Sequence, residues 1–256
     1  MKKLIIGSTL LLTTGSAFAD IVGIYAGGGV WGTELNGEIG ETTESAQPLD
    51  ADDLGVDAEA NTFFYVALEH PVPVIPNIKL MHSALKLEGE TNNLAGTVVD
   101  LDPDSSEFIV PADGYVNTEV DFSHTDATLY YEILDNYISI DLGLTARALD
   151  GYARVSTHQD VEEVEFDGVV PMLYLKGQFD LPFTGWYAGG HGNFLSIGDN
   201  EFTDLDVRIG YLTDGLGLDF GFDIGYRQMK LVVDESSEAK ADIEVGGPYL
   251  SVQMHF

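Results

Sequence analysis

The 256-residue sequence has no cysteine, few basic residues, and no second long hydrophobic run after its first twenty residues. Without cysteine no disulfide can stabilise the fold, so an exported protein of this kind must depend on secondary structure and packing. Only 11 Lys and Arg accompany 43 Asp and Glu, which gives a formal net charge of −32. This balance argues against nucleic acid as a partner, because phosphate binding requires basic side chains.

The lack of a long apolar run also restricts how the protein can enter a membrane. A spanning helix needs about 20 apolar residues, and only helices and closed barrels satisfy every backbone hydrogen bond in lipid. A membrane-embedded form must therefore be a closed β-barrel. The acidity does not indicate disorder, because 45% of the residues are hydrophobic and 11% are aromatic, a composition that disordered acidic chains lack.

The N-terminus has the pattern of a secretory signal peptide. Two lysines precede the short apolar run "LIIGSTLLL", and small residues at Ala17 and Ala19 form an Ala-x-Ala cleavage site. This order of basic, apolar and small residues is typical of signal peptides. We therefore expect cleavage after Ala19, which divides the chain into a signal peptide at 1–19 and one domain at 20–256.

Alternation with a period of two is the main structural signal in the rest of the chain. In "LGLDFGFDIGYRQ" every second residue from Leu216 to Tyr226 is apolar, and the residues between them are Gly and Asp, followed by Arg227. A soluble β-sandwich also alternates, but its strands average five or six residues. The longer repeats found here are typical of transmembrane strands. Ten segments show them: 21–33, 61–70, 78–90, 118–133, 137–150, 165–180, 185–198, 201–212, 216–232 and 240–256.

We therefore predict an all-β fold, a single transmembrane antiparallel β-barrel of about ten strands. Such barrels have short periplasmic turns and longer external loops. The connections "PVPVIPN", "LDN", "LPFTG" and "TDG" are short, whereas three on the other side, 34–60, 91–117 and 151–164, are the longest in the chain. The first two of these long loops are rich in acidic residues and contain no basic ones. The expected location is the outer membrane of a Gram-negative bacterium, in contact with lipid and lipopolysaccharide.

Charged residues within the strands are expected to face the lumen, because Arg or Lys at the bilayer midplane costs about 2–4 kcal/mol. A tight turn at "LTDG" places Tyr211 opposite Leu216 and Arg208 near Asp219 inside the barrel. Two interpretations remain open: the charges line a narrow polar pore, or they fill the lumen with ion pairs. The predicted lumen cluster is Asp141, Arg147, Lys176, Asp206, Arg208, Asp219, Asp223 and Arg227.

Glycine occurs beside aromatic residues in "YAGGGVWG" and "WYAGGHGNF". Glycine weakens an ordinary strand, but in a narrow barrel it permits bulges and close backbone contacts. We expect these glycines to leave room in the lumen for Tyr and Arg of neighbouring strands. Aromatic residues near strand ends are expected to form girdles at the membrane surfaces, namely Trp31, Tyr131, Tyr137, Phe179, Phe183, Trp186, Tyr211 and Phe256.

The final strand, "PYLSVQMHF", carries Leu250, Val252, Met254 and Phe256 on one face. This is the form of terminal strand that the barrel-assembly machinery recognises. Together with the Gly-Gly element in "VGGPYLSVQMHF", it makes the chain resemble small Gram-negative outer-membrane barrels, in particular the OmpW-like proteins. The resemblance implies an eight-stranded barrel with a hydrophobic channel, whereas the segment count gives ten strands.

The acidic loops suggest a site for divalent cations shared with lipopolysaccharide phosphates. Ca²⁺ and Mg²⁺ prefer clustered carboxylate oxygens, although "DADD" lacks the spacing and glycine of an EF-hand loop. No cofactor is expected. The weak metal candidates are Asp50, Asp52, Asp53, Asp100, Asp102 and Asp104.

Enzyme patterns are weaker still. An omptin-like protease would place an acidic pair and an Asp/His pair across the external mouth, and Asp50, Asp52, His158 and Asp160 mimic this with the last pair in inverted order. A lipid hydrolase needs Ser and His on one rim, but "MHSA" places its His and Ser on opposite faces. The leading hypothesis is a porin-like or structural barrel without catalysis. The alternatives are surface interaction through the acidic loops and a barrel-rim hydrolase.

Overall fold

The structure is a computed structural model, and it contains strands but no helices among the residues it describes. In that part of the chain no helix is long and apolar enough to cross a bilayer. The predicted signal peptide at 1–19 lies outside the described residues. The described residues are 22–39, 49–72, 74–101, 108–213, 215, 218–234 and 240–256.

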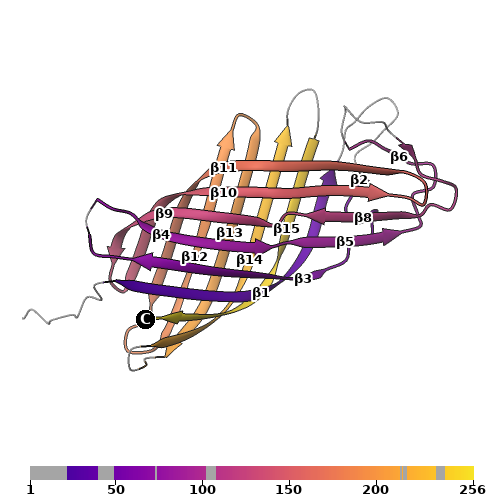
Figure 1. The fold of residues 1–256 in the computed structure, drawn as a ribbon. Coiled ribbons are helices and arrows are strands. Elements are labelled where there is room, and N and C mark those ends of the chain that lie inside the picture. The colour runs from indigo at the N-terminus through magenta and orange to yellow at the C-terminus, as the bar shows by residue number, and fades with distance from the viewer. Residues whose placement is uncertain are drawn as a thin grey trace, which may run out of the picture.

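Ten antiparallel strands close into a barrel (Figure 1), which confirms the prediction of ten strands rather than eight. Each strand pairs with its neighbour in the ring, and pairing of β1 with β15 and of β10 with β11 completes the closure. In ring order the strands are β1 (Gly23–Ile39), β3 (Glu59–Glu69), β4 (Asn77–Ala84), β9 (His124–Asp135), β10 (Ile138–Ser156), β11 (Val161–Asp180), β12 (Trp186–Ile197), β13 (Asn200–Thr213), β14 (Asp219–Asp234) and β15 (Lys240–His255).

The strands alternate between an apolar outer face and a polar inner face, as the sequence predicts. On β14 the side chains of Phe222 and Ile224 are 60% and 61% exposed, whereas Asp223 and Arg227 are buried. Lipid covers such an outer face in a membrane, so only the inner positions must be filled by the protein itself. A β-bulge in the pairing of β9 with β10 shifts this alternation near the turns, so that Leu134 faces outward.

Two predicted segments, 78–90 and 118–133, are each divided into two strands. The first contains β4 and β5 (Lys86–Thr91), and the second contains β8 (Val116–Asp121) and β9. The divisions lie side by side, because the Phe122 amide donates to the Leu85 carbonyl at 2.8 Å and the Ser123 hydroxyl accepts from the Leu85 amide at 3.0 Å. The Ser123 hydroxyl therefore takes the place of a backbone carbonyl in the hydrogen-bond ladder at this point.

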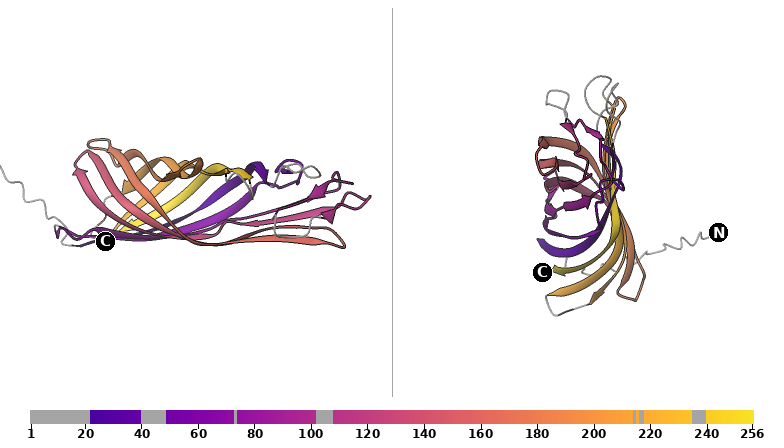
Figure 2. Two further views of the ribbon diagram at one scale, coloured as in Figure 1. Left: turned by 90° about the horizontal axis from the view of Figure 1, so that it is seen from above. Right: turned by 90° about the vertical axis from the view of Figure 1, so that its right-hand side faces the viewer.

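Beyond this point part of the barrel sheet continues past the ring as four strands. β5 pairs with β8, β8 pairs with the end of β10, and β10 pairs with β11 along its whole length. In Figure 1 these strands run to the right of the rest, and Figure 2 shows the same sheet from above. We call this sheet, together with the segments that cover it (49–57 and the described residues between 92 and 116), the extension.

The extension has a small hydrophobic core of its own. The long connections were expected to be loops, but their described residues include β2 (Leu49–Asp50), β6 (Val98–Val99) and β7 (Phe108–Ile109). Apolar side chains from these elements pack over the sheet and form a core. The sequence did not predict this core, because the segments are rich in acidic residues. This core contains Leu49, Leu54, Leu94, Val99, Leu101, Phe108, Val110, Val116 and Val155.

The predicted register between β13 and β14 is wrong. Tyr211 lies opposite Phe222 and not Leu216, and Arg208 lies opposite Gly225 and not near Asp219. The reason is a longer turn than the sequence suggested. The Gly215 amide donates to Asp219 at 2.7 Å, so β14 begins only at Asp219.

Trp31 is also placed differently from the prediction. It is 1% exposed and lies in the lumen, where its indole Nε1 donates to the Gly247 carbonyl at 3.2 Å. Its neighbour Val30 faces outward, so the alternation of β1 turns Trp31 inward. The other predicted girdle residues are exposed near strand ends: Tyr131, Tyr137, Phe179, Phe183, Trp186, Tyr211 and Phe256.

The terminal strand β15 has the predicted outward face. Leu250, Val252 and Met254 are between 37% and 63% exposed, and Phe256 follows at 47%. The backbone of Phe256 pairs with Ile24 of β1 in both directions, at 2.9 and 3.0 Å. Recognition of this strand by the assembly machinery stays a prediction.

We expect Gly225→Ala to destabilise the barrel. A Cβ atom at this inward position would lie 2.6 Å from the ring of Tyr249, and overpacking of this kind costs about 1–3 kcal/mol. Gly177→Ala is the matched control, because a Cβ atom there would meet no other atom within 4 Å. Urea titration of the refolded barrels, followed by heat-modifiable migration on gels, measures the difference. Equal stability of the two variants would contradict the packing described here.

Candidate functional site in the barrel lumen

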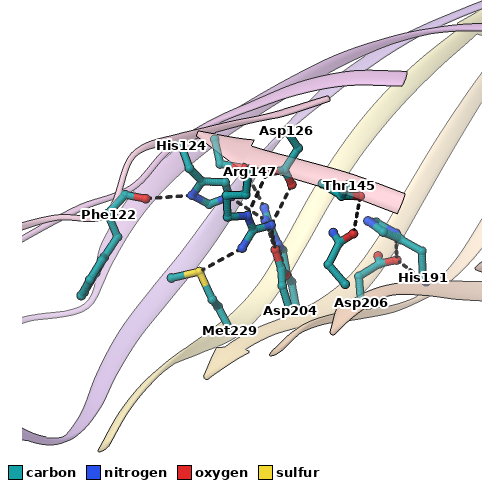
Figure 3. Close-up of polar contacts among 12 residues, drawn as sticks. Phe122, His124, Asp126, Thr145, Arg147, His191, Asp204, Asp206 and Met229 are labelled. Carbon is teal, nitrogen blue, oxygen red and sulfur yellow. Dashed lines mark hydrogen bonds and ion pairs between the residues drawn. The ribbon is translucent and has the colours of Figure 1, made fainter. Parts of the chain in front are cut away.

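A buried ionic network crosses the middle of the lumen (Figure 3), and its centre is Asp204 on β13. Arg147 of β10 donates to Asp126 of β9 at 2.7 and 2.8 Å and to Asp204 at 2.5 Å. Arg227 of β14 donates to both carboxylate oxygens of Asp204, at 2.7 and 2.9 Å. Two guanidinium groups and two carboxylates therefore neutralise one another where water is excluded.

The network reaches from one wall of the barrel to the opposite wall. Arg227 donates to the Ser83 hydroxyl of β4 at 3.0 Å, lies 3.3 Å from the His124 Nε2 atom of β9, and stacks on Trp31 of β1. In a ring of ten strands β14 and β9 are five places apart, so these contacts span the full width of the lumen. Buried ion pairs such as those of Arg147 and Arg227 are stable only because each guanidinium has several partners.

An apolar cluster fills the lumen between this network and the extension. Its side chains come from β1, β3, β4, β11, β13, β14, β15 and the base of the extension, and they form one contiguous group. Trp31, Met172 and Met229 are each at most 4% exposed. Arg147 contacts this cluster as well, because its guanidinium lies 5.1 Å from the centre of the Phe202 ring. Side chains thus fill the half of the lumen that is nearer the extension, which we call the upper half.

Below the network, which means on its side away from the extension, the lumen contains a cavity of about 350 Å³. This cavity reaches the strand ends near the short turns. Lys176 pairs with Asp141 at 2.8 Å on one side. Asp206 accepts from Arg208 at 2.8 Å and lies 2.6 Å from the His191 ring. The remaining wall is largely aromatic, and it includes Tyr25, Tyr65, Tyr130, Tyr174 and Tyr249.

The structure divides the predicted lumen cluster between these regions. Arg147 and Arg227 belong to the network, whereas Asp219 lies at the mouth near His255, at 3.8 Å. Four others line the cavity, namely Lys176, Asp206, Arg208 and Asp223. Asp141 lies behind this lining as the ion-pair partner of Lys176.

Sequence reasoning missed the residues at the centre of the network, His124, Asp126 and Asp204. His124 and Asp126 follow the inward alternation of β9, as Asp204 and Asp206 do on β13. The alternation along each strand could have identified these residues as inward-facing. It does not reveal which inward residues contact one another.

The same three residues form the one group among the described residues that has metal-ligand spacing, with ligand atoms within 4.8 Å of one another. Asp126 and Asp204 already accept from the guanidinium groups of Arg147 and Arg227. A divalent cation here would lie beside two fixed positive charges, so the donor set does not fit a metal.

The predicted metal candidates do not form a ligand cluster in the described part of the chain. The Asp50 carboxylate accepts from the Asp52 amide at 2.9 Å, which is a local turn, and Asp53 is exposed. Asp100 is half-buried in the extension. Asp102 and Asp104 lie outside the described residues.

Two of the residues considered for hydrolysis, His158 and Asp160, lie beside the turn that begins at Thr157. The His158 ring stacks on Tyr115 with centres 4.2 Å apart, and the Asp160 carbonyl accepts from the Thr157 amide. His82 and Ser83 lie on opposite faces as predicted, since His82 is beside Thr125 at 3.0 Å and Ser83 contacts Arg227 inside the lumen.

The overall arrangement, a closed ring of long strands with an apolar belt and a polar lumen, is the outer-membrane β-barrel fold. No protein-family model matches the chain, and no curated protein matches it. The resemblance to OmpW-like proteins therefore stays a prediction.

Solved structures with a similar arrangement are outer-membrane barrels. They include the outer membrane protease OmpT of Escherichia coli, with 11% identity, a TM-score of 0.49, and coverage of 93% of this chain and 96% of that one. A FadL homologue of Pseudomonas aeruginosa has 10% identity, a TM-score of 0.33 and coverage of 93% and 64%. The toluene transporter TodX of P. putida has 12% identity, a TM-score of 0.28 and coverage of 93% and 90%. Likeness at this level concerns the fold alone.

We expect Arg227→Met to destabilise the barrel strongly. The change leaves the Asp204 carboxylate buried with one guanidinium partner, and breaking a buried pair costs about 3–5 kcal/mol. Lys230→Met on the same strand is the control, because Lys230 pairs with the exposed Asp242 at 3.2 Å and exposed pairs contribute about 0–1 kcal/mol. Urea denaturation in micelles compares the two variants. A loss of similar size in both would refute a special role for the network.

The extension should loosen in acid through Asp121. Burial raises the pKa of this carboxyl group, but hydrogen bonds from Ser123 and Lys86 outweigh burial and leave the pKa below its usual value. A lowered pKa stabilises the fold above the unfolded value, about 3.9, and this stability is lost as the pH falls through the folded value. Limited proteolysis from pH 7 to 3 should show earlier cleavage of Asp121→Asn at neutral pH and convergence with the unchanged protein in acid. Parallel curves at all pH values would contradict this assignment.

Proposed function

We propose that this protein is a non-catalytic, non-conducting outer-membrane barrel that anchors an acidic extension outside the cell. The observation that carries the proposal is the network around Asp204, together with the apolar cluster above it. A pore needs a continuous path for water, and here Arg147 is 0% exposed in the centre of the lumen. The ion-pair interpretation of the lumen charges is therefore favoured over the pore.

The extension supports surface interaction as the specific role of such an anchor. Its outward face carries one row across four strands, in which Glu88 lies opposite Glu119, Glu119 opposite Arg154, and Arg154 opposite Glu163. Three carboxylates and one guanidinium leave this row acidic. The core beneath it holds these side chains on a defined sheet, so the surface suits cationic groups, including divalent cations that bridge lipopolysaccharide phosphates.

Planar-bilayer recording tests the proposal. We expect the refolded protein to give no steady conductance, because side chains fill the lumen. Because the apolar cluster also closes the lumen, we expect conductance only when Trp31, Met172 and Met229 are changed to alanine together with the three charged residues of the network, Arg147, Asp204 and Arg227. This expectation holds for a variant that migrates as a folded, heat-modifiable barrel. Arg154→Ala combined with Glu163→Ala is the control, because this pair lies in the extension.

Steady conductance of the unchanged protein would refute the closed lumen and restore the porin-like hypothesis. Recordings are repeated with millimolar Ca²⁺. If side chains close the lumen, the barrel does not conduct with or without Ca²⁺. Binding of Ca²⁺ to the extension is then detected through altered protease sensitivity of that region.

A further inference from the structure

The cavity below the network contains a lysine with no acidic partner. Lys79 of β4 points into the lumen, and its Nζ atom lies 5.1 Å from the centre of the Tyr65 ring. Every other Lys or Arg whose side chain the structure describes forms an ion pair with a carboxylate. In a chain with 43 acidic residues, an unpaired ammonium inside a barrel is a conspicuous exception.

Unpaired carboxylates lie close by, nearer the mouth of the same cavity. Glu69, Glu132 and Asp135 all line it. Glu69 accepts from the Tyr130 hydroxyl at 2.7 Å, and none of the three carboxylates forms an ion pair with a Lys, Arg or His of the described chain. The bulge in the pairing of β9 with β10 brings Asp135 to the inner side.

The pairing of the strands separates these opposite charges along the barrel axis. Lys79 lies opposite Ala67 of β3, and Glu69 is two residues nearer the short turns. Two residues of a strand span about 7 Å. The lysine side chain reaches toward Tyr65, on the far side of Ala67 from Glu69, so the two charges do not meet.

We propose that this cavity binds a small zwitterion of about dipeptide size, which enters from the end of the barrel opposite the extension. Lys79 receives the ligand's carboxylate at the inner end, and Glu69 and Glu132 receive its ammonium group near the mouth. The tyrosines between them provide apolar ring faces and hydroxyl groups. The cavity volume of about 350 Å³ is within the range of small-molecule sites. This inference goes beyond the proposed function, because it concerns neither conductance nor the extension.

Three matched probes test the charge requirement in the full-length refolded protein by calorimetry. They are Ala-Ala, which carries both charges, N-acetyl-Ala-Ala, which carries only the carboxylate, and Ala-Ala amide, which carries only the ammonium. We expect Ala-Ala to bind and each single-charge probe to bind about tenfold more weakly or worse, since each loses a charge-assisted contact. No binding of Ala-Ala would overturn the proposal. Equal binding of N-acetyl-Ala-Ala would replace the zwitterion site with a simple anion site and would overturn it too.

Variants identify the groups that recognise each end. Lys79→Met should weaken Ala-Ala about tenfold or more, and Lys79→Arg should retain binding. Lys86→Met is the control, because Lys86 lies on the extension and pairs with Asp121. Glu132→Gln should weaken Ala-Ala but not N-acetyl-Ala-Ala. Heat-modifiable migration verifies folding, and the three probes on the unchanged protein decide the matter if a variant fails to fold. Unchanged binding by folded Lys79→Met would refute the assignment.

Discussion

The structure depends on one constraint, which is that charged side chains within the membrane-spanning part of a barrel have only the lumen as a place to lie. A closed ring satisfies every backbone group, but the period of two then directs half of all side chains inward. In a ten-stranded barrel these side chains meet. Asp204 is the clearest result, because it receives guanidinium groups from β10 and from β14 and so couples both sides of the ring.

This network divides the lumen into two regions. Above it, apolar side chains fill the lumen and continue into the base of the extension, which has a core of its own. Below it, a cavity remains, which is lined largely by tyrosine rings and charged side chains. This division is the basis of our proposal that the barrel does not conduct.

Much of the fold follows from local sequence pattern, and the residues show why the rest does not. Alternation on β14 predicted the outward Phe222 and the inward Arg227, because strand geometry alone decides the face. The predicted register of β14 was wrong because we assumed a shorter turn before this strand. The Asp219 side chain accepts a hydrogen bond from the Gly215 amide and so belongs to the turn. The extension was missed because its core is assembled from short apolar pieces far apart in the chain.

The sequence by itself determined the class of fold, the count of ten strands and the face of most strand residues. These features depend on composition and on a period of two, which neighbouring residues set. Only the tertiary structure decided that Asp204 joins two arginines, that Trp31 lies inside and that Lys79 has no acidic partner. The contact between Arg147 and Asp204 joins strands that are not neighbours in the ring. The alternation along a strand states which way a side chain points but not which side chain it meets.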